Sequence, residues 1–355
     1  MPFSAFQIDF KKWDNLPLIP KTIWLQKLLR GIVIDNLLPR LGGDVVIHGS
    51  YRTGNIGDLT IGNVIKTQIQ SIYNKKCIIN GNLLTKPNFS KYNTHIIGGG
   101  TIYDSYILEK KIKPIDYSKS TIALGISIGP ILTNRAKILL KKLEKAELIT
   151  VRDKISKEKL NSIINNDIKI TSCPAFLFEN NIAKKEIKNS CGVSLREFHF
   201  KLLKESEQKS KKLKFLSFLN RNLKELSKKY DLYFIPFSLE DINFVNKHFR
   251  KYFFKILPLK SPENTLSNIK MMEKMICMRF HSMIFSIIAE KPIFTISYAD
   301  KMKEITNEIS NNVDVYNIEG TEIIDFNINK SLIRSIKFKH KQMANQNFEL
   351  LKNYI

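Results

Sequence analysis

Cysteine is scarce in this sequence. Four cysteines stand among 355 residues, at Cys77, Cys173, Cys191 and Cys277. They lack the paired spacing of zinc sites, and the six histidines form no spaced metal set either. We therefore expect no metal site and no disulfide framework, and we interpret the thiols as reduced and buried in a cytoplasmic protein.

Long hydrophobic runs are also missing. No window offers the roughly 18 to 20 uninterrupted apolar residues of a membrane span. The first residues lack a basic segment followed by an apolar stretch, so we expect no secretory signal. Apolar residues make up 43% and charged residues 25% of the chain, which is typical of a soluble globular protein long enough for two domains.

Acidic residues are few compared with basic ones: 33 against 57, for a net charge of +24. Such an excess fits nucleic acid, an anionic membrane surface or an anionic substrate, and AT-rich codon bias is an alternative source of lysine. No nucleic-acid-reading motif accompanies the charge, so we expect no nucleic-acid partner. Residues 19–41 mix apolar and basic side chains, which predicts an amphipathic helix that either lies on an anionic membrane or packs onto the first domain.

Strand and helix patterns alternate in two series, which predicts the α/β class with two doubly wound, Rossmann-like domains facing a cleft. We expect a helical extension over 1–43, a first domain over 44–178, a linker over 179–190, a second domain over 191–330 and a C-terminal helix over 331–355. The predicted strands cover 44–49, 77–80, 95–97, 121–128, 148–152 and 168–172, then 191–195, 232–236, 253–257, 275–278 and 292–297.

Two glycine-rich segments follow predicted strands of the first domain. Gly49 to Asp58 opens a helix, a position that favours an anion, although Asp58 as a simple helix cap is an equal alternative. It has neither a P-loop lysine nor the spacing of a dinucleotide fingerprint. Gly98, Gly99 and Gly100 come directly after the next strand and indicate either a backbone close to a ligand or tight strand–helix packing.

The second domain carries a stronger pattern. Arg279 and His281 lie between the strand 275–278 and a helix predicted over 282–289, where helix N–H groups attract anions. Arginine offers a planar fork for phosphate or carboxylate, and histidine can move a proton near neutral pH. Arg196 ends another strand of the same domain, so we expect its guanidinium to point into the cleft toward His281.

Taken in order, these segments resemble the polysaccharide pyruvyl transferase family over residues 44–301. The matching residues are Gly54-Asn55-Ile56-Gly57-Asp58, Gly98-Gly99-Gly100 with Asp104, Gly125 with Gly129-Pro130, Val151-Arg152-Asp153 with Ser156, Ser194-Leu195-Arg196, Pro236-Phe237 with Asp241, Met278-Arg279-Phe280-His281, and Ser297-Tyr298 with Lys301. One departure is Cys173-Pro174, where the family usually has Asp-Pro.

The resemblance implies a glycosyltransferase-B-like fold and an enzyme that uses phosphoenolpyruvate, with no further cofactor, to place pyruvate as a ketal on a sugar. The sugar would belong to a cell-surface polysaccharide or its lipid-linked precursor, at the inner face of the cytoplasmic membrane. His281 and Arg279 would be catalytic. The substrate-binding residues would be these two together with Asn55, Asp58, Gly99, Gly100, Arg196 and Lys301.

Two alternatives stay open. The same fold could serve a nucleotide-sugar-dependent glycosyltransferase, in which Arg279 would hold the diphosphate. A non-catalytic assembly protein at the membrane surface would fit the basic composition and Cys173. For the pyruvyl transferase we expect His281→Ala and Arg279→Ala each to reduce activity strongly while leaving the fold intact.

Overall fold

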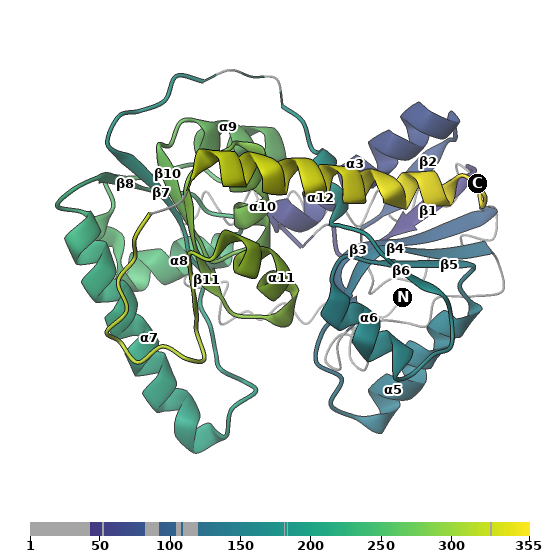
Figure 1. Cartoon of the computed structure of the whole chain (residues 1–355), viewed down its shortest axis with the longest axis horizontal. Helices are drawn as coiled ribbons and strands as arrows, with labels where there is room; N and C mark the ends of the chain where they lie inside the picture. Colours follow the sequence, from purple (N-terminus) through teal and green to yellow (C-terminus); the bar gives the residue numbers. More distant parts are fainter. Residues whose placement is uncertain are drawn as a thin grey trace, which may run out of the picture. The chain divides into compact units, whose positions relative to one another are not determined.

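The computed structural model describes residues 43–51, 53–81, 92–103, 108, 120–180, 182, 184–326 and 329–355. The chain divides into two compact units (Figure 1). Unit 1 is Met1–Leu177 together with Met343–Ile355, and unit 2 is Phe178–Gln342. The extension predicted over 1–43 lies outside the described residues except at Gly43.

Unit 1 is built on a six-stranded parallel sheet in the order β2-β1-β3-β4-β5-β6. Its elements are β1 (Val45–His48), α3 (Ile56–Tyr73), β2 (Cys77–Asn80), β3 (Thr94–Tyr103), β4 (Ser120–Ile128), α5 (Asn134–Lys141), β5 (Leu148–Val151), α6 (Lys154–Asn161) and β6 (Ile168–Ile170). Short 3-10 helices cover Lys142–Lys145 and Pro174–Leu177.

Helices cover both faces of this sheet, which explains why its central strands are apolar on both sides. Ile97 of β3 belongs to a buried cluster that includes Leu140 of α5 and Leu160 of α6. The next residue, Gly98, faces α3, because a Cβ there would lie 2.5 Å from the Ile65 side chain. Successive residues of a strand point to opposite faces, so α3 lies on one face and α5 and α6 on the other.

Unit 2 repeats the architecture with a parallel sheet in the order β12-β11-β10-β7-β8-β9. Its strands are β7 (Ser190–Ser194), β8 (Asp231–Phe234), β9 (Lys255–Ile256), β10 (Lys274–Cys277), β11 (Ile293–Ser297) and β12 (Asn312–Asp314). Its helices are α7 (Glu205–Leu226), α8 (Leu239–His248), α9 (Pro262–Lys270), α10 (Phe280–Ile288) and α11 (Asp300–Ile309), with a 3-10 turn at Arg250–Tyr252.

An aromatic-rich core fills one face of the second sheet. Phe215 and Phe218 of α7 and Phe244 of α8 lie there against Val193 of β7 and Ile276 of β10. On the other face, Cys277 at the end of β10 contacts the Ser286 hydroxyl of α10 at 3.3 Å. The sheet thus places the carboxyl ends of β7, β10 and β11 side by side, which is where the following side chains gather.

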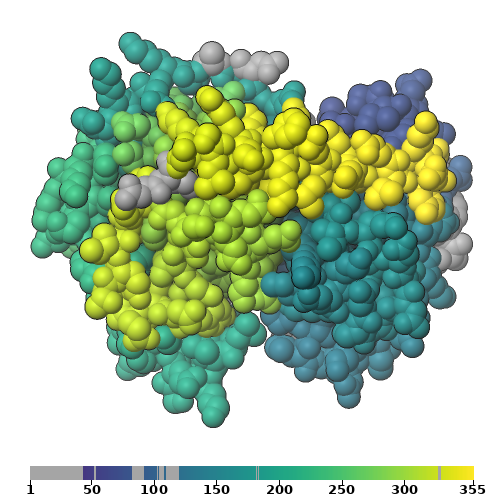
Figure 2. All heavy atoms as spheres, viewed as in Figure 1, coloured from purple at the N-terminus to yellow at the C-terminus, as the bar shows by residue number. Residues whose placement is uncertain are grey.

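The last helix, α12 (Lys330–Leu351), begins in unit 2 and ends in unit 1. Part of it lies on the visible surface in Figure 2. Its end is anchored in unit 1 by Asn347, which is fully buried and whose side-chain oxygen accepts hydrogen bonds from Thr150 (2.6 Å) and Thr171 (2.8 Å). The Asn347 amide donates to the carbonyl of Ser172 at 3.0 Å. Every polar atom of this buried amide therefore has a partner.

Three local expectations were wrong. The glycines 98–100 lie inside β3 rather than after it, and α10 begins at Phe280 rather than at Ser282. Asn55, not Asp58, caps α3, because its side-chain oxygen accepts from the Gly57 N–H at 2.9 Å. The helix α11 and the strand β12 were not predicted at all.

Candidate functional site

Cationic side chains gather at the carboxyl edge of the unit 2 sheet. Arg196 follows β7, Arg279 follows β10, and Lys301 lies in the first turn of α11, just after β11. These three strands are neighbours and run parallel, so their carboxyl ends meet at one edge. Edges of this kind are the usual ligand site of open α/β sheets.

Tyr298 is the point on which these cations converge. Arg196 Nη1 donates to the Tyr298 hydroxyl at 3.3 Å, and the Arg196 guanidinium carbon lies 5.0 Å from the ring centre. Lys301 Nζ lies 5.7 Å from the same ring centre. Burial alone would raise the pKa of Tyr298, but Lys301, Arg196 and Arg279 outweigh it and lower the pKa to about 7. Such a shift requires a strongly positive local potential, which is what an anionic ligand needs.

Arg279 is held by a buried carboxylate. It is 7% exposed, and its Nε lies 3.1 Å from both oxygens of Asp241, which is fully buried. Its Nη2 donates to Asp241 and, at 2.6 Å, to the Ser238 hydroxyl. Burial would lower the pKa of Arg279, but the charge of Asp241 outweighs it, so the net shift is upward. Arg279 is therefore a fixed cation.

This geometry modifies two expectations for Arg279. The fork was expected to face a ligand, yet its Nε–Nη2 edge is occupied by Asp241 and Ser238, which leaves the Nη1 group for an anion. Arg279→Ala was expected to leave the fold intact. Removing the guanidinium would strand a buried carboxylate, which typically costs about 3–5 kcal/mol. We now expect that substitution to destabilise unit 2 as well.

His281 lies in the first turn of α10, two residues after the N-cap Arg279. It is 7% exposed, and its ring meets that of Phe280 edge-on at 5.3 Å. The early start of α10 places the histidine on the helix instead of in the preceding loop, with a fixed backbone beside the cations. That Arg196 points into a cleft toward His281 stays a prediction.

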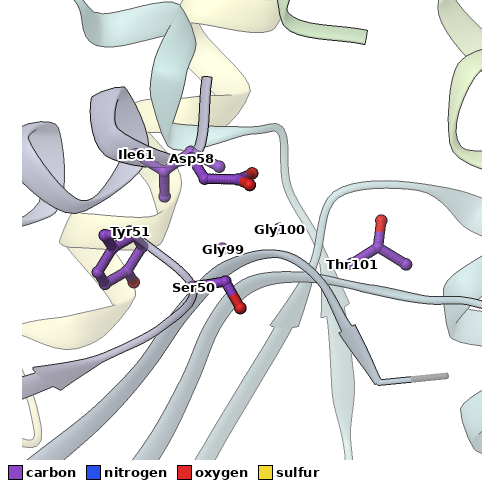
Figure 3. Close-up of a pocket in the computed structure, with 7 residues that line it drawn as sticks. All are labelled: Ser50, Tyr51, Asp58, Ile61, Gly99, Gly100 and Thr101. Atoms are coloured by element: carbon purple, nitrogen blue, oxygen red, sulfur yellow. The ribbon is translucent and has the colours of Figure 1, made fainter. Parts of the chain in front are cut away.

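Unit 1 has a small hollow of its own. It is lined by Ser50, Tyr51, Asp58, Ile61, Gly99, Gly100 and Thr101 (Figure 3). The Asp58 side chain extends from α3 over Gly99 and Gly100 in this view. Three of the residues expected to bind substrate, Asp58, Gly99 and Gly100, are thus brought together. Asn55 is used as the cap of α3, and Arg52 of the same loop lies outside the described residues.

The glycines of β3 allow tight packing of the strand against α3, one of the two roles that were left open. A Cβ on Gly99 would lie 2.3 Å from the Ile61 side chain of α3, so the helix could not approach the strand as it does. Gly99 and Gly100 also adopt φ values of +48° and +83°, which other residues rarely adopt. The ladder to β4 is irregular between Gly100 and Tyr103. Gly99 and Gly100, with their positive φ values, form part of the lining of the hollow.

Arg152 lies beside this hollow. Its Nη2 donates to the Thr101 hydroxyl at 3.1 Å, and its Nη1 lies 3.7 Å from the Cys173 sulfur. Burial raises the pKa of Cys173, so the thiol is neutral where the resemblance implies a carboxylate. Asp153 caps α6 by accepting from the Ser156 N–H at 2.7 Å.

Sequence reasoning assigned no role to Tyr298, Asp241 or Ser238. Asp241 and Tyr298 were named only as parts of matching motifs. The signal that could have found Asp241 is its place after the strand adjacent to that of Arg196, with Ser238 three residues earlier as a capping box. Nothing local indicates its pairing with Arg279, 38 residues away in the chain.

The described residues offer neither a cluster of metal ligands nor a membrane-spanning helix. No group of three or more His, Cys, Asp or Glu residues there could hold a metal ion. None of the helices in that part of the chain is both long and apolar enough to cross a membrane.

Comparison with solved structures supports the fold. A protein of Listeria monocytogenes provisionally named as a UDP-N-acetylglucosamine 2-epimerase superposes with a TM-score of 0.52 at 9% identity, over 87% of this chain and 95% of that one. The S. aureus MnaA–UDP structure gives 0.49 at 8% identity, over 85% and 91%. TarM gives 0.44 at 10% identity over 74% of this chain, which spans 54% of TarM.

Comparison with curated proteins gave no match. The family model of the polysaccharide pyruvyl transferases matches residues 55–300, a stretch that holds Asp58 and both glycines of the unit 1 hollow as well as Arg196, Asp241, Arg279, His281 and Tyr298 of unit 2. The chain belongs to the polysaccharide pyruvyl transferase family.

Proposed function

We propose that this transferase moves pyruvate from phosphoenolpyruvate to a sugar of a cell-surface polysaccharide, or of its lipid-linked precursor, and leaves it as a ketal. The observation that carries the proposal is the convergence of Arg196, Arg279 and Lys301 around Tyr298 at the carboxyl edge of the unit 2 sheet. Phosphoenolpyruvate carries a phosphate and a carboxylate on adjacent groups. A cluster of three cations matches that charge.

Each cation has a distinct part in this proposal. Arg196 and Lys301 are half-buried and bind the phosphate and carboxylate oxygens, because their side chains reach the edge from two different elements, the end of β7 and the start of α11. Arg279 is held by Asp241 and supplies a fixed positive charge and its Nη1 donor. A preorganised charge needs no reorganisation when phosphate leaves.

His281 is the proposed general acid. Its protonated ring gives a proton to the methylene carbon of phosphoenolpyruvate, which makes the neighbouring carbon electrophilic. A sugar hydroxyl attacks that carbon, phosphate departs, and a second hydroxyl closes the ketal. Two hydroxyl protons are released: one balances the proton placed on carbon, and the other leaves with phosphate. A general acid typically contributes about 10²–10⁴-fold to such a step.

The hollow of unit 1 is the proposed site for sugar hydroxyl groups. Asp58 offers a carboxylate that accepts hydrogen bonds, and Ser50 and Thr101 offer hydroxyl groups. The turned backbone at Gly99 and Gly100 brings peptide groups close to the same space. The chemistry of this lining fits a neutral polyhydroxy ligand better than an anion.

We further propose that the protein works in contact with the inner face of the cytoplasmic membrane. The support is the net charge of +24 and the basic, apolar segment 19–41. A lipid-linked acceptor would be met there, and each Lys or Arg near an anionic surface contributes about 1 kcal/mol of attraction.

A ligand screen by thermal shift tests the proposed donor. A ligand that binds the native state raises its melting temperature by mass action. We expect phosphoenolpyruvate to stabilise the protein and UDP and GDP to leave it unchanged. Stabilisation by a nucleotide alone would instead establish the nucleotide-sugar glycosyltransferase. The matched variants are Arg196→Ala, which should lose the response to phosphoenolpyruvate, and Arg250→Ala, which alters an exposed arginine of the same unit and should keep it.

A further inference from the structure

Tyr298 occupies the place of a ligand within the cation cluster. Its hydroxyl oxygen accepts from Arg196 at 3.3 Å, and the guanidinium carbon of Arg196 lies over its ring at 5.0 Å. Lys301, a second cation at the same edge, has its Nζ 5.7 Å from the centre of the Tyr298 ring. Arginine donors that a phosphate or carboxylate would use are thus directed to a phenol.

Two acidic groups near this edge form ion pairs with other cations. Asp241 from α8 pairs with Arg279, and Asp300 from α11 pairs with Lys303 at 2.9 Å. Among the described residues no carboxylate forms an ion pair with Arg196, whose other hydrogen bond goes to the Glu197 carbonyl at 3.4 Å. The groups that face Tyr298 are Arg196 after β7, Arg279 at the start of α10, Lys301 in α11 and the apolar ring of Phe198 at 5.7 Å. The charged groups that act most strongly on the phenol are therefore all cationic.

The electrostatic consequence follows from this geometry. Burial would keep the phenol neutral, but Lys301, Arg196 and Arg279 together lower the pKa of Tyr298 from 10.0 to about 7. Its neighbour Tyr316, which also touches the Phe198 ring at 5.5 Å, shows the opposite shift, because burial, Asp314 and Asp300 raise its pKa. The pKa values of two tyrosines in one aromatic cluster are therefore shifted in opposite directions.

We propose that Tyr298 is the internal anion of the donor site: without ligand its phenolate balances the cations, and when an anionic ligand binds, it takes up one proton from solvent and becomes neutral. The inference rests on the proposed function for the identity of the ligand, but any phosphate-like anion bound by Arg196 and Lys301 would produce the same protonation. No bond other than the O–H bond changes, and water or buffer supplies the proton.

The role is a positioning role with a measurable signature. The phenolate holds Arg196 and Lys301 at the edge while the site is empty, which limits their mutual repulsion. A ligand anion then competes with the phenolate for the same donors. Protonation of Tyr298 removes that competition, so binding of the donor and uptake of a proton are linked.

The test measures the ultraviolet absorbance of tyrosinate in the whole protein at about pH 8, where ordinary tyrosines are neutral. We expect wild type to show one phenolate that Tyr298→Phe lacks, and Tyr316→Phe to retain it. Saturating phosphoenolpyruvate or inorganic phosphate should raise the titration midpoint of Tyr298 by about one pH unit or more, and so reduce this absorbance by about half or more. Calorimetry in buffers of different ionisation enthalpy should show uptake of up to one proton per bound anion.

The outcomes separate this inference from the proposed donor. If inorganic phosphate protonates Tyr298 and phosphoenolpyruvate does not, the inference stands and the donor assignment is wrong. If phosphoenolpyruvate binds without change in absorbance or proton uptake, the donor stands and the inference is overturned. The inference is also overturned if no anion tested changes the signal. The absorbance and calorimetric readouts need only wild type, so they decide the question even if Tyr298→Phe does not fold.

Discussion

Arg279 and Asp241 form a buried ion pair that joins the starts of two helices in unit 2. Asp241 is the third residue of α8 and accepts from the backbone N–H groups of Phe237 and Ser238, each at 3.0 Å. Arg279 is the N-cap of α10. One carboxylate thus completes a capping box and fixes the cation that begins the helix of His281. Stability and ligand binding share these two residues.

Removing this carboxylate should destabilise the protein. Asp241→Asn keeps a side chain of similar shape but leaves the Arg279 guanidinium buried without its counter-charge. We expect the free energy of unfolding to fall by about 3–5 kcal/mol, measured by urea denaturation. The control is Asp231→Asn, at an exposed position of the same unit, which should change it by less than about 0.5 kcal/mol. Equal stability of the two variants would show that the pair contributes nothing.

Replacing His281 should affect catalysis more than donor binding. We expect His281→Ala to lower kcat by about 10²–10⁴-fold, because it removes the proposed proton donor. The calorimetric affinity for phosphoenolpyruvate should change far less than with Arg196→Ala. His248→Ala alters a half-buried histidine in α8 and should keep normal turnover. A His281→Ala enzyme with near-normal kcat would remove His281 from the reaction.

Acid should weaken unit 1 through a buried histidine pair. His48 Nε2 lies 3.2 Å from His95 Nδ1, and Asn80 lies 3.1 Å from the other nitrogen of His48. Burial, and secondly His95, lower the pKa of His48 from 6.5 to about 3. The unfolded chain therefore binds a proton at a pH where the folded chain does not, so stability is fully present above pH 6.5 and declines as the pH falls toward 3.

As the pH falls from about 7 to about 5, the His48 group should lower the free energy of unfolding by about 2 kcal/mol. The measurement is urea denaturation at both pH values. His48→Gln should lose that part of the pH dependence, whereas His199→Gln, at an exposed position, should keep it. An unchanged slope in His48→Gln would assign the acid sensitivity to other groups.

Membrane association should depend on charge. We expect the protein to sediment with anionic vesicles at low salt and to be released as salt rises, because screening weakens attraction to the lipid surface. Neutral vesicles are the control. Equal partitioning to both kinds of vesicle, or to neither, would contradict membrane association by charge and would favour codon bias as the origin of the net charge of +24.

The positions of Arg196 and Arg279 were predictable because strand ends can be recognised from local sequence. Alternating apolar strands and helices imply a parallel sheet, and such a sheet collects its ligand residues at one edge. Their adjacency was not predictable in the same way. It depends on β7 lying beside β10 although α7, β8, α8, β9 and α9 intervene in the chain.

Other features depend on contacts that no local pattern encodes. Asp241 has the form of any first-turn acid, and only the fold shows Arg279 against it. Tyr298 precedes a helix that was missed, and two of the three cations around it, Arg196 and Arg279, follow other strands. The run Gly98-Gly99-Gly100 suggested that the strand had ended, yet β3 continues through it. Glycine is needed at Gly98 and Gly99 because α3 packs so closely that a side chain there would clash.

Calorimetric titration of phosphoenolpyruvate tests the central claim most directly. Wild type and Asp58→Asn, which alters the proposed acceptor hollow in unit 1, should bind phosphoenolpyruvate equally well. The double variant Arg196→Ala/Lys301→Ala should lose binding by about 100-fold or more, since hydrogen bonds to charged groups contribute about 1.5–3 kcal/mol each. Failure of wild type to bind phosphoenolpyruvate, or equal binding by the double variant, would contradict the donor site at the carboxyl edge of unit 2.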